Sequence, residues 1–515
     1  MTPPMDSATG RLAAVLPDTP PAVRHRLAAI DLGSNSFHLL VANYHDERLQ
    51  VVARLGEKVQ LAAGLGDDGR LSEDAIQRAL DCLSRFAPFL GDIPPGYLRV
   101  VGTNALRDAD NNQEFIERAE ALLGTRIEII AGREEARLIY LGAAHALAEN
   151  GRRLIVDIGG GSTEFIIGER FEPLALESLG MGCVTYTRRF FANGDISEKR
   201  FRKAELAALS ELANIQRPYL RLGWSDPVGS SGTIKAAAAV IAAASETPDG
   251  VITREGLFAL RDRLVKFKRL DKVSLEGLKA DRARVFPAGV AILCAIFEAL
   301  ELETMRYADG ALREGVLYDM VGRNSPEDSR LKSLENLERS YGVDARQADN
   351  VADTALALFA QVRDAWSLDD DQARFLGWAS RLHEIGLAIS HSQFHRHGAY
   401  LLEHSDLAGF SRPEQRLLAF LVRGHRRKFP LKEWKALPAA EQRSHARLVR
   451  LLRLAVLINH SRPEQAPALP RLMADNDELI VAFASDDTPS LLMTDLEQEI
   501  GFQQAVGFSL RLAQA

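Results

Sequence analysis

The sequence predicts an α/β protein with two related domains, because two of its segments repeat each other. Residues 29–42, AIDLGSNSFHLLVA, align with residues 156–168, VDIGGGSTEFIIG. Each reads as a β-hairpin, in which an apolar strand ends in Asp and a turn of small residues leads to a second apolar strand. Residues 98–107 and 226–235 form a second matching pair, and each follows its hairpin at a similar interval. A duplicated domain explains both repeats.

The stretches between the repeats alternate between helical and strand periodicity, which is typical of α/β folds. We expect helices over residues 72–90, 112–123, 134–147 and 197–212, and a strand over residues 126–130. The sequence therefore predicts sheets covered by helices.

Helical periodicity replaces the hairpins from about residue 326. It covers residues 345–365, 372–384, 412–423 and 444–459, whereas residues 478–512 return to short apolar runs. The predicted organisation is a disordered tail (1–24), a first α/β domain (25–138), a second one (139–322), a helical domain (323–475) and a small β-containing C-terminal domain (476–515).

Composition predicts a soluble cytoplasmic protein. A peripheral contact with the inner membrane is compatible with this composition. The 515 residues carry a formal net charge of -7, and no apolar run is long enough to span a membrane. Cys82, Cys183 and Cys294 lie far apart without CxxC spacing, which argues against a disulfide framework or a zinc site. We expect buried free thiols.

The small residues of the two hairpin turns are suited to binding phosphate. Gly, Ser and Thr let the backbone approach an anion and supply N–H and hydroxyl donors. Asp31 and Asp157 end the preceding strands, where they would repel phosphate unless a divalent cation lay between them, so the pattern indicates Mg²⁺. One such hairpin could be an ordinary glycine-rich turn capped by Asp, but a matched pair favours a phosphate site.

The loops DLGSNSFH and DIGGGSTE resemble the phosphate motifs of the actin, sugar kinase and Hsp70 superfamily. The sequences of these loops are similar to those of the exopolyphosphatase and guanosine pentaphosphatase family in particular. GTNALR, REEARL, MGCVTY, GSSGTIKAA, DGALREGVLYD and FHRHGAYLLEHSDL extend the match over nearly the whole chain. The resemblance implies two actin-like (ribonuclease H-like) domains, an all-α His-Asp-phosphohydrolase-like domain and a small C-terminal cap.

The resemblance also implies the roles of the site residues. Glu135, in REEARL, would be the catalytic base, although acidic residues are common in the first turn of a helix without any catalytic role. Asp157, Glu164 and Asp31 would be metal-associated, and Glu164 could equally be a solvated strand residue. Phosphate contacts would come from Ser34, Asn35, Ser36, Thr103, Arg107, Gly160, Gly161, Ser162, Thr163, Gly232 and Thr233. The guanidinium of Arg107 could clamp a phosphate, but an Arg after a strand is otherwise often a surface residue.

Basic residues gather in the predicted helical domain. Residues 412–453 hold twelve Lys or Arg against three acids, a local charge of +9. Such a region suits a polyanion, and a solvated helix face is the alternative. A polyphosphate channel is expected to involve His395, Arg396, His397, Arg423, His425, Arg426, Arg427 and Lys428. LHEIG, with His383 and Glu384, resembles a degenerate His-Asp motif kept for binding, so we expect no second metal centre.

These features predict an exopolyphosphatase, which removes the terminal phosphate from inorganic polyphosphate. Glu135 would activate the attacking water, Mg²⁺ would assist the reaction, and K⁺ is a candidate activator. The same machinery could hydrolyse guanosine pentaphosphate (pppGpp to ppGpp). A sugar-kinase-like transferase and a non-catalytic sensor of polyphosphate or alarmone are further alternatives. The resemblance also implies a homodimer; the sequence gives no sign of nucleic-acid binding.

Overall fold

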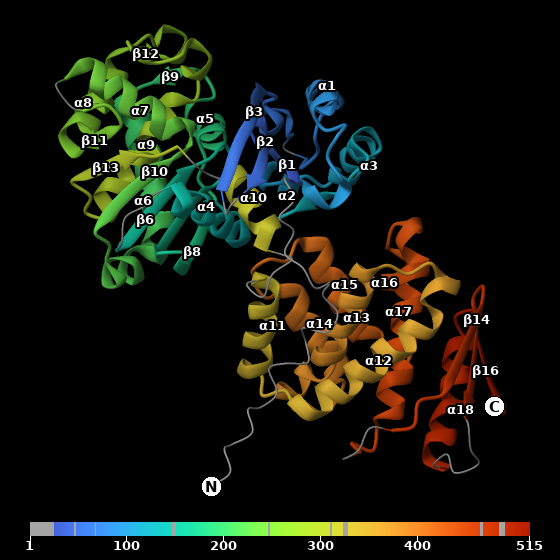
Figure 1. Cartoon of the computed structure of the whole chain (residues 1–515). Coiled ribbons are helices and arrows are strands. Elements are labelled where there is room, and N and C mark those ends of the chain that lie inside the picture. Colours follow the sequence, from blue (N-terminus) through green and yellow to red (C-terminus); the bar gives the residue numbers. More distant parts are fainter. Residues whose placement is uncertain are drawn as a thin grey trace. The chain divides into compact units, whose positions relative to one another are not determined.

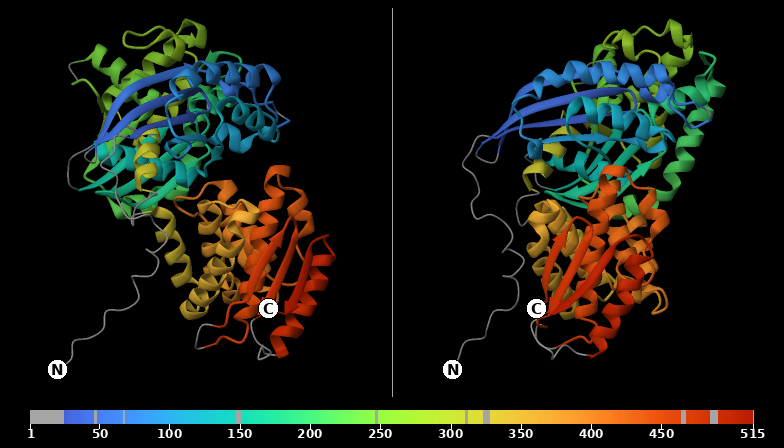
Figure 2. Two further views of the ribbon diagram at one scale, coloured as in Figure 1. Left: turned by 45° about the vertical axis from the view of Figure 1, so that its right-hand side comes forward. Right: turned by 90° about the vertical axis from the view of Figure 1, so that its right-hand side faces the viewer.

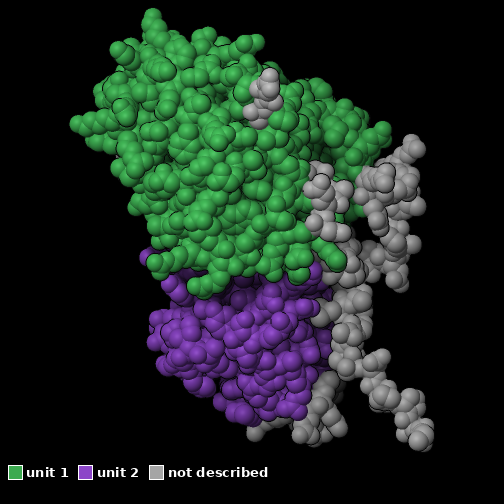
Figure 3. Space-filling model, turned by 90° about the vertical axis from the view of Figure 1, so that its left-hand side faces the viewer, with its two compact units in different colours: residues 1–328 green, residues 329–515 purple. Residues whose placement is uncertain are grey.

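The computed structural model describes residues 25–45, 48–66, 68–146, 151–245, 248–309, 312–322, 328–463, 467–483 and 490–514. The predicted disordered tail, residues 1–24, lies outside this set. The chain divides into two compact units, residues 1–328 and 329–515 (Figures 1 and 3). We describe each unit by itself.

The first sheet of unit 1 has five strands in the order β3-β2-β1-β4-β5. β1 (His25–Leu32), β2 (Ser36–His45) and β3 (Arg48–Lys58) form the antiparallel ribbon drawn in blue in Figure 2, and β4 (Leu98–Gly102) and β5 (Ile127–Ile129) add parallel strands. The apolar faces of α1 (Glu73–Phe86) and α3 (Asn112–Leu123) share a core with this sheet.

The second sheet repeats this topology. Its order is β11-β13-β10-β6-β7-β8. β6 (Arg152–Ile158), β7 (Thr163–Glu169) and β8 (Glu172–Leu179) are antiparallel neighbours, and β10 (Asp226–Ser230) pairs in parallel with β6, as β4 does with β1. β11 (Val251–Thr253) and β13 (Thr304–Tyr307) complete the sheet. The repeat confirms the predicted actin-like pair of domains.

Two helices connect the sheets (Figure 1). α4 (Gly132–Ala146) and α10 (Leu312–Gly322) pack against each other and share one core with apolar residues of β1, β2, β6 and β7. The crossing is close at Gly315, where an added Cβ would overlap the backbone carbonyl of Leu138. Both helices thus touch both halves of unit 1.

Helices also cover the outer side of the second sheet. α6 (Glu198–Leu222), α7 (Ser231–Ala244), α8 (Arg254–Lys266) and α9 (Phe286–Ala299) contribute to the largest core of the molecule. Cys82, Cys183 and Cys294 are all buried and free, as expected.

Unit 2 is helical, with a small β-containing end, which confirms the predicted architecture. Its bundle consists of α11 (Ser329–Ser340), α12 (Ala345–Trp366), α13 (Asp370–Leu382), α14 (Phe394–His404), α15 (Arg412–Gly424), α16 (Leu431–Lys435) and α17 (Ala439–Ile458). A three-stranded sheet follows, made of β14 (Arg471–Asp475), β15 (Glu478–Phe483) and β16 (Ser509–Gln514), with α18 (Ser490–Gln504) connecting the parallel pair β15 and β16 (red in Figure 2). None of the helices in the described ranges is long and apolar enough to cross a membrane.

Helix boundaries differ from the expectation where tertiary packing outweighs local signals. The helix expected over residues 197–212 continues to Leu222 through Pro218, with Tyr219 buried in the core beyond the proline. The helix expected over residues 372–384 ends at Leu382, and the one expected to begin at residue 444 begins at Ala439.

Two arginines of the basic region are interior residues, which corrects the expectation of an exposed basic surface. Arg450 and Arg453 on α17 are at most 2% exposed. Arg453 pairs with Glu499 at 2.5 Å, and Arg450 donates to Gln503 and to backbone carbonyls. These guanidiniums fasten α17 to the C-terminal cap, because a buried charge needs partners.

The close crossing of α4 and α10 yields a stability prediction. Gly315→Ala should lower the free energy of unfolding of unit 1 by about 1–3 kcal/mol, since the methyl group meets backbone that cannot turn away. Gly322→Ala, in the same helix, is the matched control, because its added Cβ has open space. Urea unfolding of both variants decides the point, and equal stabilities would contradict the close crossing.

Candidate active site

The two duplicated turns lie against each other. An ideal Cβ on Gly160 would lie 2.9 Å from the Cβ of Ser34 and 3.3 Å from the backbone nitrogen of Asn35, and one on Gly161 would overlap the Asn104 side chain. Side chains at these glycines would push the loops apart. Asp31 and Asp157, which precede the turns, therefore belong to one site.

Four carboxyl groups share this site. Asp31 lies at the end of β1, and Asp157 pairs across β6 and β7 with Glu164. Glu135 lies in the first turn of α4 and is buried, as is Glu164, so Glu164 is not a solvated strand residue. Asp31 and Asp157 keep partial exposure. The predicted residues from four separate elements are thus brought together.

Burial raises the pKa of all four groups, and the charge of Glu135 adds to this at Asp31, Asp157 and Glu164. Burial is the largest cause at Asp31, whose pKa rises to about 7, and the charges of Glu135 and Asp157 add to it. Burial likewise raises the pKa of Asp157 to about 6. The pKa of Glu164 is raised well above its ordinary value by burial, then by Glu135 and Asp157. Neighbouring carboxyl groups of this kind are stabilised by bound protons or by a cation that lies between them.

The residues present fit Mg²⁺. Within the described part of the chain, the buried Oδ1 atom of Asp31 has no hydrogen-bond partner. No group of three or more His, Cys, Asp or Glu in that part could by itself enclose a metal ion. Mg²⁺ commonly takes one or two carboxylates and completes its shell with water and substrate phosphate, so it does not need such a group. Asp31 and Asp157 are the best placed to hold it, since both keep partial exposure whereas Glu164 is buried and accepts a hydrogen bond of 2.8 Å from Ser178.

Arg107 orients Glu135. It is part of α2 (Asn104–Asp108), directly after β4, and its Nη1 atom donates to Glu135 Oε2 at 2.9 Å and to the carbonyl of Ile130 at 2.7 Å. Burial raises the pKa of Glu135 and outweighs the opposing effect of Arg107. A carboxylate with a raised pKa is a better general base near neutral pH. Arg107 is therefore a partner of Glu135 here, rather than a surface residue.

The hydroxyls of the predicted phosphate contacts differ in availability. Thr163 is fully buried and donates to the carbonyl of Met181, so a phosphate contact from this residue would come from its backbone N–H. The Thr103 hydroxyl faces the carbonyl of Leu32 at 3.5 Å. Ser34 accepts from the Ala105 N–H at 3.2 Å. Gly232 and Thr233 lie in the first turn of α7, where free N–H groups attract anions.

The sequence reasoning missed cations that surround the site. The guanidinium of Arg282 lies against Gly232, where an added Cβ would overlap it. The charge of Arg313, near the start of α10, lowers the pKa of both Asp31 and Asp157. It is the largest influence after burial at Asp31 and a smaller one at Asp157. Burial, then Arg313, Arg282 and Arg54, lower the pKa of His38 to about 3, so this imidazole stays neutral. These arginines come from separate elements, and no local motif marks them as a set.

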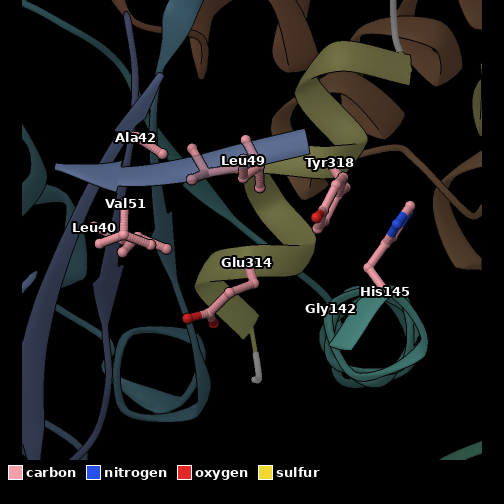
Figure 4. Close-up of a pocket in the computed structure, with 9 residues that line it drawn as sticks. Leu40, Ala42, Leu49, Val51, Gly142, His145, Glu314 and Tyr318 are labelled. Atoms are coloured by element: carbon pink, nitrogen blue, oxygen red, sulfur yellow. The ribbon is translucent and has the colours of Figure 1, made fainter. Parts of the chain in front are cut away.

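A small pocket lies between α10, the C-terminal half of α4 and strands β2 and β3 (Figure 4). It measures about 110 Å³ and is lined by Leu40, Ala42, Leu49, Val51, Gly142, His145, Glu314, Leu317 and Tyr318. His145 stacks on Tyr318 with ring centroids 3.5 Å apart. The lining includes none of the residues of the two turns, so this pocket is not the phosphate site.

In unit 2 the residues expected to form a polyphosphate channel differ in exposure and fall into three groups. His395 and His425 are buried, with ring centroids 6.2 Å apart, and His425 binds the carbonyl of Val422 through Nδ1 at 2.6 Å. Arg396, Arg427 and Lys428 are exposed, whereas His397, Arg423 and Arg426 are partly buried. Arg426 lies over the ring of Phe394 at 4.6 Å. Among the described residues, His395 Nδ1 and His425 Nε2 are buried without a hydrogen-bond partner, and a role for all eight residues in a channel stays a prediction.

The raised pKa of Asp31 yields a prediction for the metal-free protein. Because the pKa of Asp31 rises from 3.8 to about 7 on folding, the folded protein binds this proton more tightly than the unfolded chain does. The resulting contribution to stability is fully present below pH 3.8 and is lost as the pH rises toward 7. In chelator, Asp31→Asn should therefore be more stable than the wild type at pH 8, by up to about 4 kcal/mol, with a smaller advantage at pH 5.

Urea unfolding at both pH values measures this difference. Asp81→Asn, on the exposed side of α1, is the control for removing a carboxylate outside the site. An Asp31→Asn variant that is less stable than the wild type at pH 8 would show that the carboxylates do not repel one another.

Comparison with known proteins matches both units to one family. The family model described as Ppx/GppA phosphatase family matches residues 40–324, and Ppx/GppA phosphatase, domain III, matches residues 329–500. Guanosine-5'-triphosphate,3'-diphosphate pyrophosphatase of Vibrio cholerae serotype O1 is 43% identical over 94% of this chain and 97% of its own. The Aeromonas hydrophila protein of the same name is 41% identical over 95% and 99%.

Solved structures agree on the fold of unit 1. A Ppx/GppA family member from Aquifex aeolicus superposes with a TM-score of 0.50 at 28% identity, covering 59% of this chain and 99% of its own. An exopolyphosphatase from Cytophaga hutchinsonii superposes with a TM-score of 0.53 at 26% identity, covering 58% and 98%.

These findings show that the predicted exopolyphosphatase activity is wrong. The relatives that match almost the whole chain at 40–43% identity are named for a guanosine nucleotide. The prediction failed because the motifs on which it rested were assigned to the handling of a terminal phosphoanhydride, a group that both substrates contain. The motifs that suggested the activity therefore do not distinguish a polyphosphate chain from a nucleotide.

Proposed function

The chain belongs to the Ppx/GppA phosphatase family, and on that premise we propose that it hydrolyses guanosine 5'-triphosphate 3'-diphosphate, removing the terminal phosphate of the 5' chain. The observation that supports this most strongly is the hydrogen bond of 2.9 Å from Arg107 to Glu135, next to two phosphate-type turns that lie against each other. The names of the full-length relatives supply the substrate.

The turns would hold the terminal phosphate from both sides. Backbone N–H groups of residues 34–36 and 160–163, with the first turn of α7, would donate to its oxygens, because glycine-rich turns and helix starts bind anions. Arg282 and Arg313 would add positive charge near the site. Mg²⁺, when held by Asp31 and Asp157, would neutralise charge on the phosphate oxygens.

Glu135 would act on the attacking water. It would accept the proton as the water oxygen bonds to the terminal phosphorus and the bond to the bridging oxygen breaks, leaving the 5'-diphosphate as the other product. Arg107 would fix the direction of the Glu135 carboxylate. Burial of Glu135 keeps competing water away from it, which strengthens its hydrogen bonds.

Product analysis tests the substrate. The wild-type protein with Mg²⁺ is expected to convert guanosine 5'-triphosphate 3'-diphosphate to the bis-diphosphate with one inorganic phosphate per turnover, and to act far more slowly on long-chain polyphosphate. Chromatography of the nucleotides and separate assays for phosphate and pyrophosphate measure this. Faster turnover of polyphosphate, or release of pyrophosphate, would contradict the proposal.

Replacement of the proposed base tests the mechanism. Glu135→Gln should lower kcat about 10²- to 10⁴-fold while nucleotide binding is retained, because the amide cannot take the proton of water. Glu205→Gln is the matched control. Glu205 on α6 is also buried, its pKa is also raised by burial, and it pairs with Arg261 on α8 at 2.9 Å. Full turnover by Glu135→Gln would remove Glu135 from the mechanism.

A further inference from the structure

A buried chain of five charged side chains joins the base-bearing helix to the rest of unit 1. Arg99 on β4 holds Glu128 through two bonds of 2.7 and 3.0 Å, and it donates to Asp319 on α10 at 2.7 Å. Arg137 on α4 donates to the other oxygen of Asp319 at 2.5 Å and holds Glu134 through two bonds of 2.8 Å. Asp319 is therefore the link between the two arginines.

This chain ends one residue before the proposed base. Glu134 and Glu135 occupy the first turn of α4, and neighbouring side chains on a helix point about 100° apart. Glu134 points toward Arg137 and Asp319, whereas Glu135 points toward Arg107. The turn is thus held from two directions, and the Asp319 side lies deep in the protein, with side chains at most 11% exposed from Arg99 to Glu134.

Stability alone does not account for such a chain. Replacing buried ion pairs by apolar residues of similar size is often neutral or stabilising, because burial of the charges costs about as much as their attraction returns. Orientation is the better explanation. The charge of Glu135 acts on Asp31, Asp157 and Glu164, which share the site with it, so these carboxylates repel Glu135 and α4 needs a restraint that keeps its first turn in place.

We propose that Asp319 is a positioning residue for the hydrolysis proposed above, on which this inference rests. By joining Arg99 to Arg137, it holds the first turn of α4 so that Glu135 stays within reach of the attacking water. Its own carboxylate contacts neither the turns nor Glu135 and takes no part in the chemistry. A shift of about 1 Å in a reacting group can cost about 10²-fold in rate, so a restraint of this kind matters for turnover.

Two substitutions test the proposal by kinetics. Asp319→Asn should lower kcat for the guanosine nucleotide about 10- to 100-fold while KM changes by less than about threefold, because the phosphate-binding turns are untouched. Arg137→Lys keeps the charge but loses the two-pronged grip on Glu134, and it should shift kcat in the same direction with less loss of stability. It serves as the second variant if Asp319→Asn folds poorly.

A matched control separates positioning from general loss of stability. Asp226 also bridges two arginines, Arg153 at 3.1 Å and Arg306 at 2.8 Å, but it lies between strands of the second sheet. Asp226→Asn should reduce thermal stability while leaving kcat within about twofold of the wild type, on the expectation that distant sites act independently. If it lowers kcat as strongly as Asp319→Asn, destabilisation explains both effects and the proposal is overturned.

Hydrogen exchange gives a readout that does not depend on activity. Amides of residues 134–138 should exchange faster in Asp319→Asn than in the wild type, and at the wild-type rate in Asp226→Asn. A wild-type protein that fails to hydrolyse the nucleotide would overturn the proposed function, and the exchange result would then decide the role of Asp319 by itself. Unchanged exchange together with unchanged kcat would overturn the positioning role.

Discussion

Repulsion among four enclosed carboxyl groups is the constraint on which the site of unit 1 depends. Asp31, Asp157, Glu164 and Glu135 come from β1, β6, β7 and α4, and they share a region where burial already disfavours negative charge. A fold tolerates such a group only if protons, cations or neighbouring arginines offset the charge. A site of this kind is stabilised when protons or cations reduce its negative charge.

The pair α4 and α10 transmits this constraint to the rest of unit 1. Both helices share a core with β-strands of the two sheets, and their backbones approach each other closely at Gly315. The first turn of α4, which carries Glu135, therefore cannot shift without disturbing packing on both sides. The chain of ion pairs through Asp319 also restrains the orientation of α4, because two-pronged arginine contacts fix angles as well as distances.

The correction of the activity concerns which part of the substrate the motifs describe. The roles expected for the turns, Glu135 and Arg107 concern a terminal phosphoanhydride, and they suit any substrate that ends in such a group. Selection of the remainder of the substrate needs contacts beyond this shared set. The full-length relatives are informative because they include those other positions, whereas the motifs do not.

Sequence by itself determined the elements whose signals are local. The duplicated hairpins follow from alternation around small-residue turns, and the helices of unit 2 follow from their apolar periodicity, so both could be predicted and both agree with the structure. The motif positions of Asp31, Asp157 and Glu135 were likewise sufficient to place them in one site. Local patterns are enough where the chain's own neighbours decide its conformation.

Only the tertiary structure decided the contacts between distant segments. It placed Arg282 against Gly232, made Arg107 the partner of Glu135 and turned the Thr163 hydroxyl to a backbone carbonyl. It also buried Arg450 and Arg453, which a charge count had assigned to the surface. These outcomes depend on which faces meet after folding, and burial reverses the preference of a charged side chain once partners are supplied. No spacing along the chain contains that information.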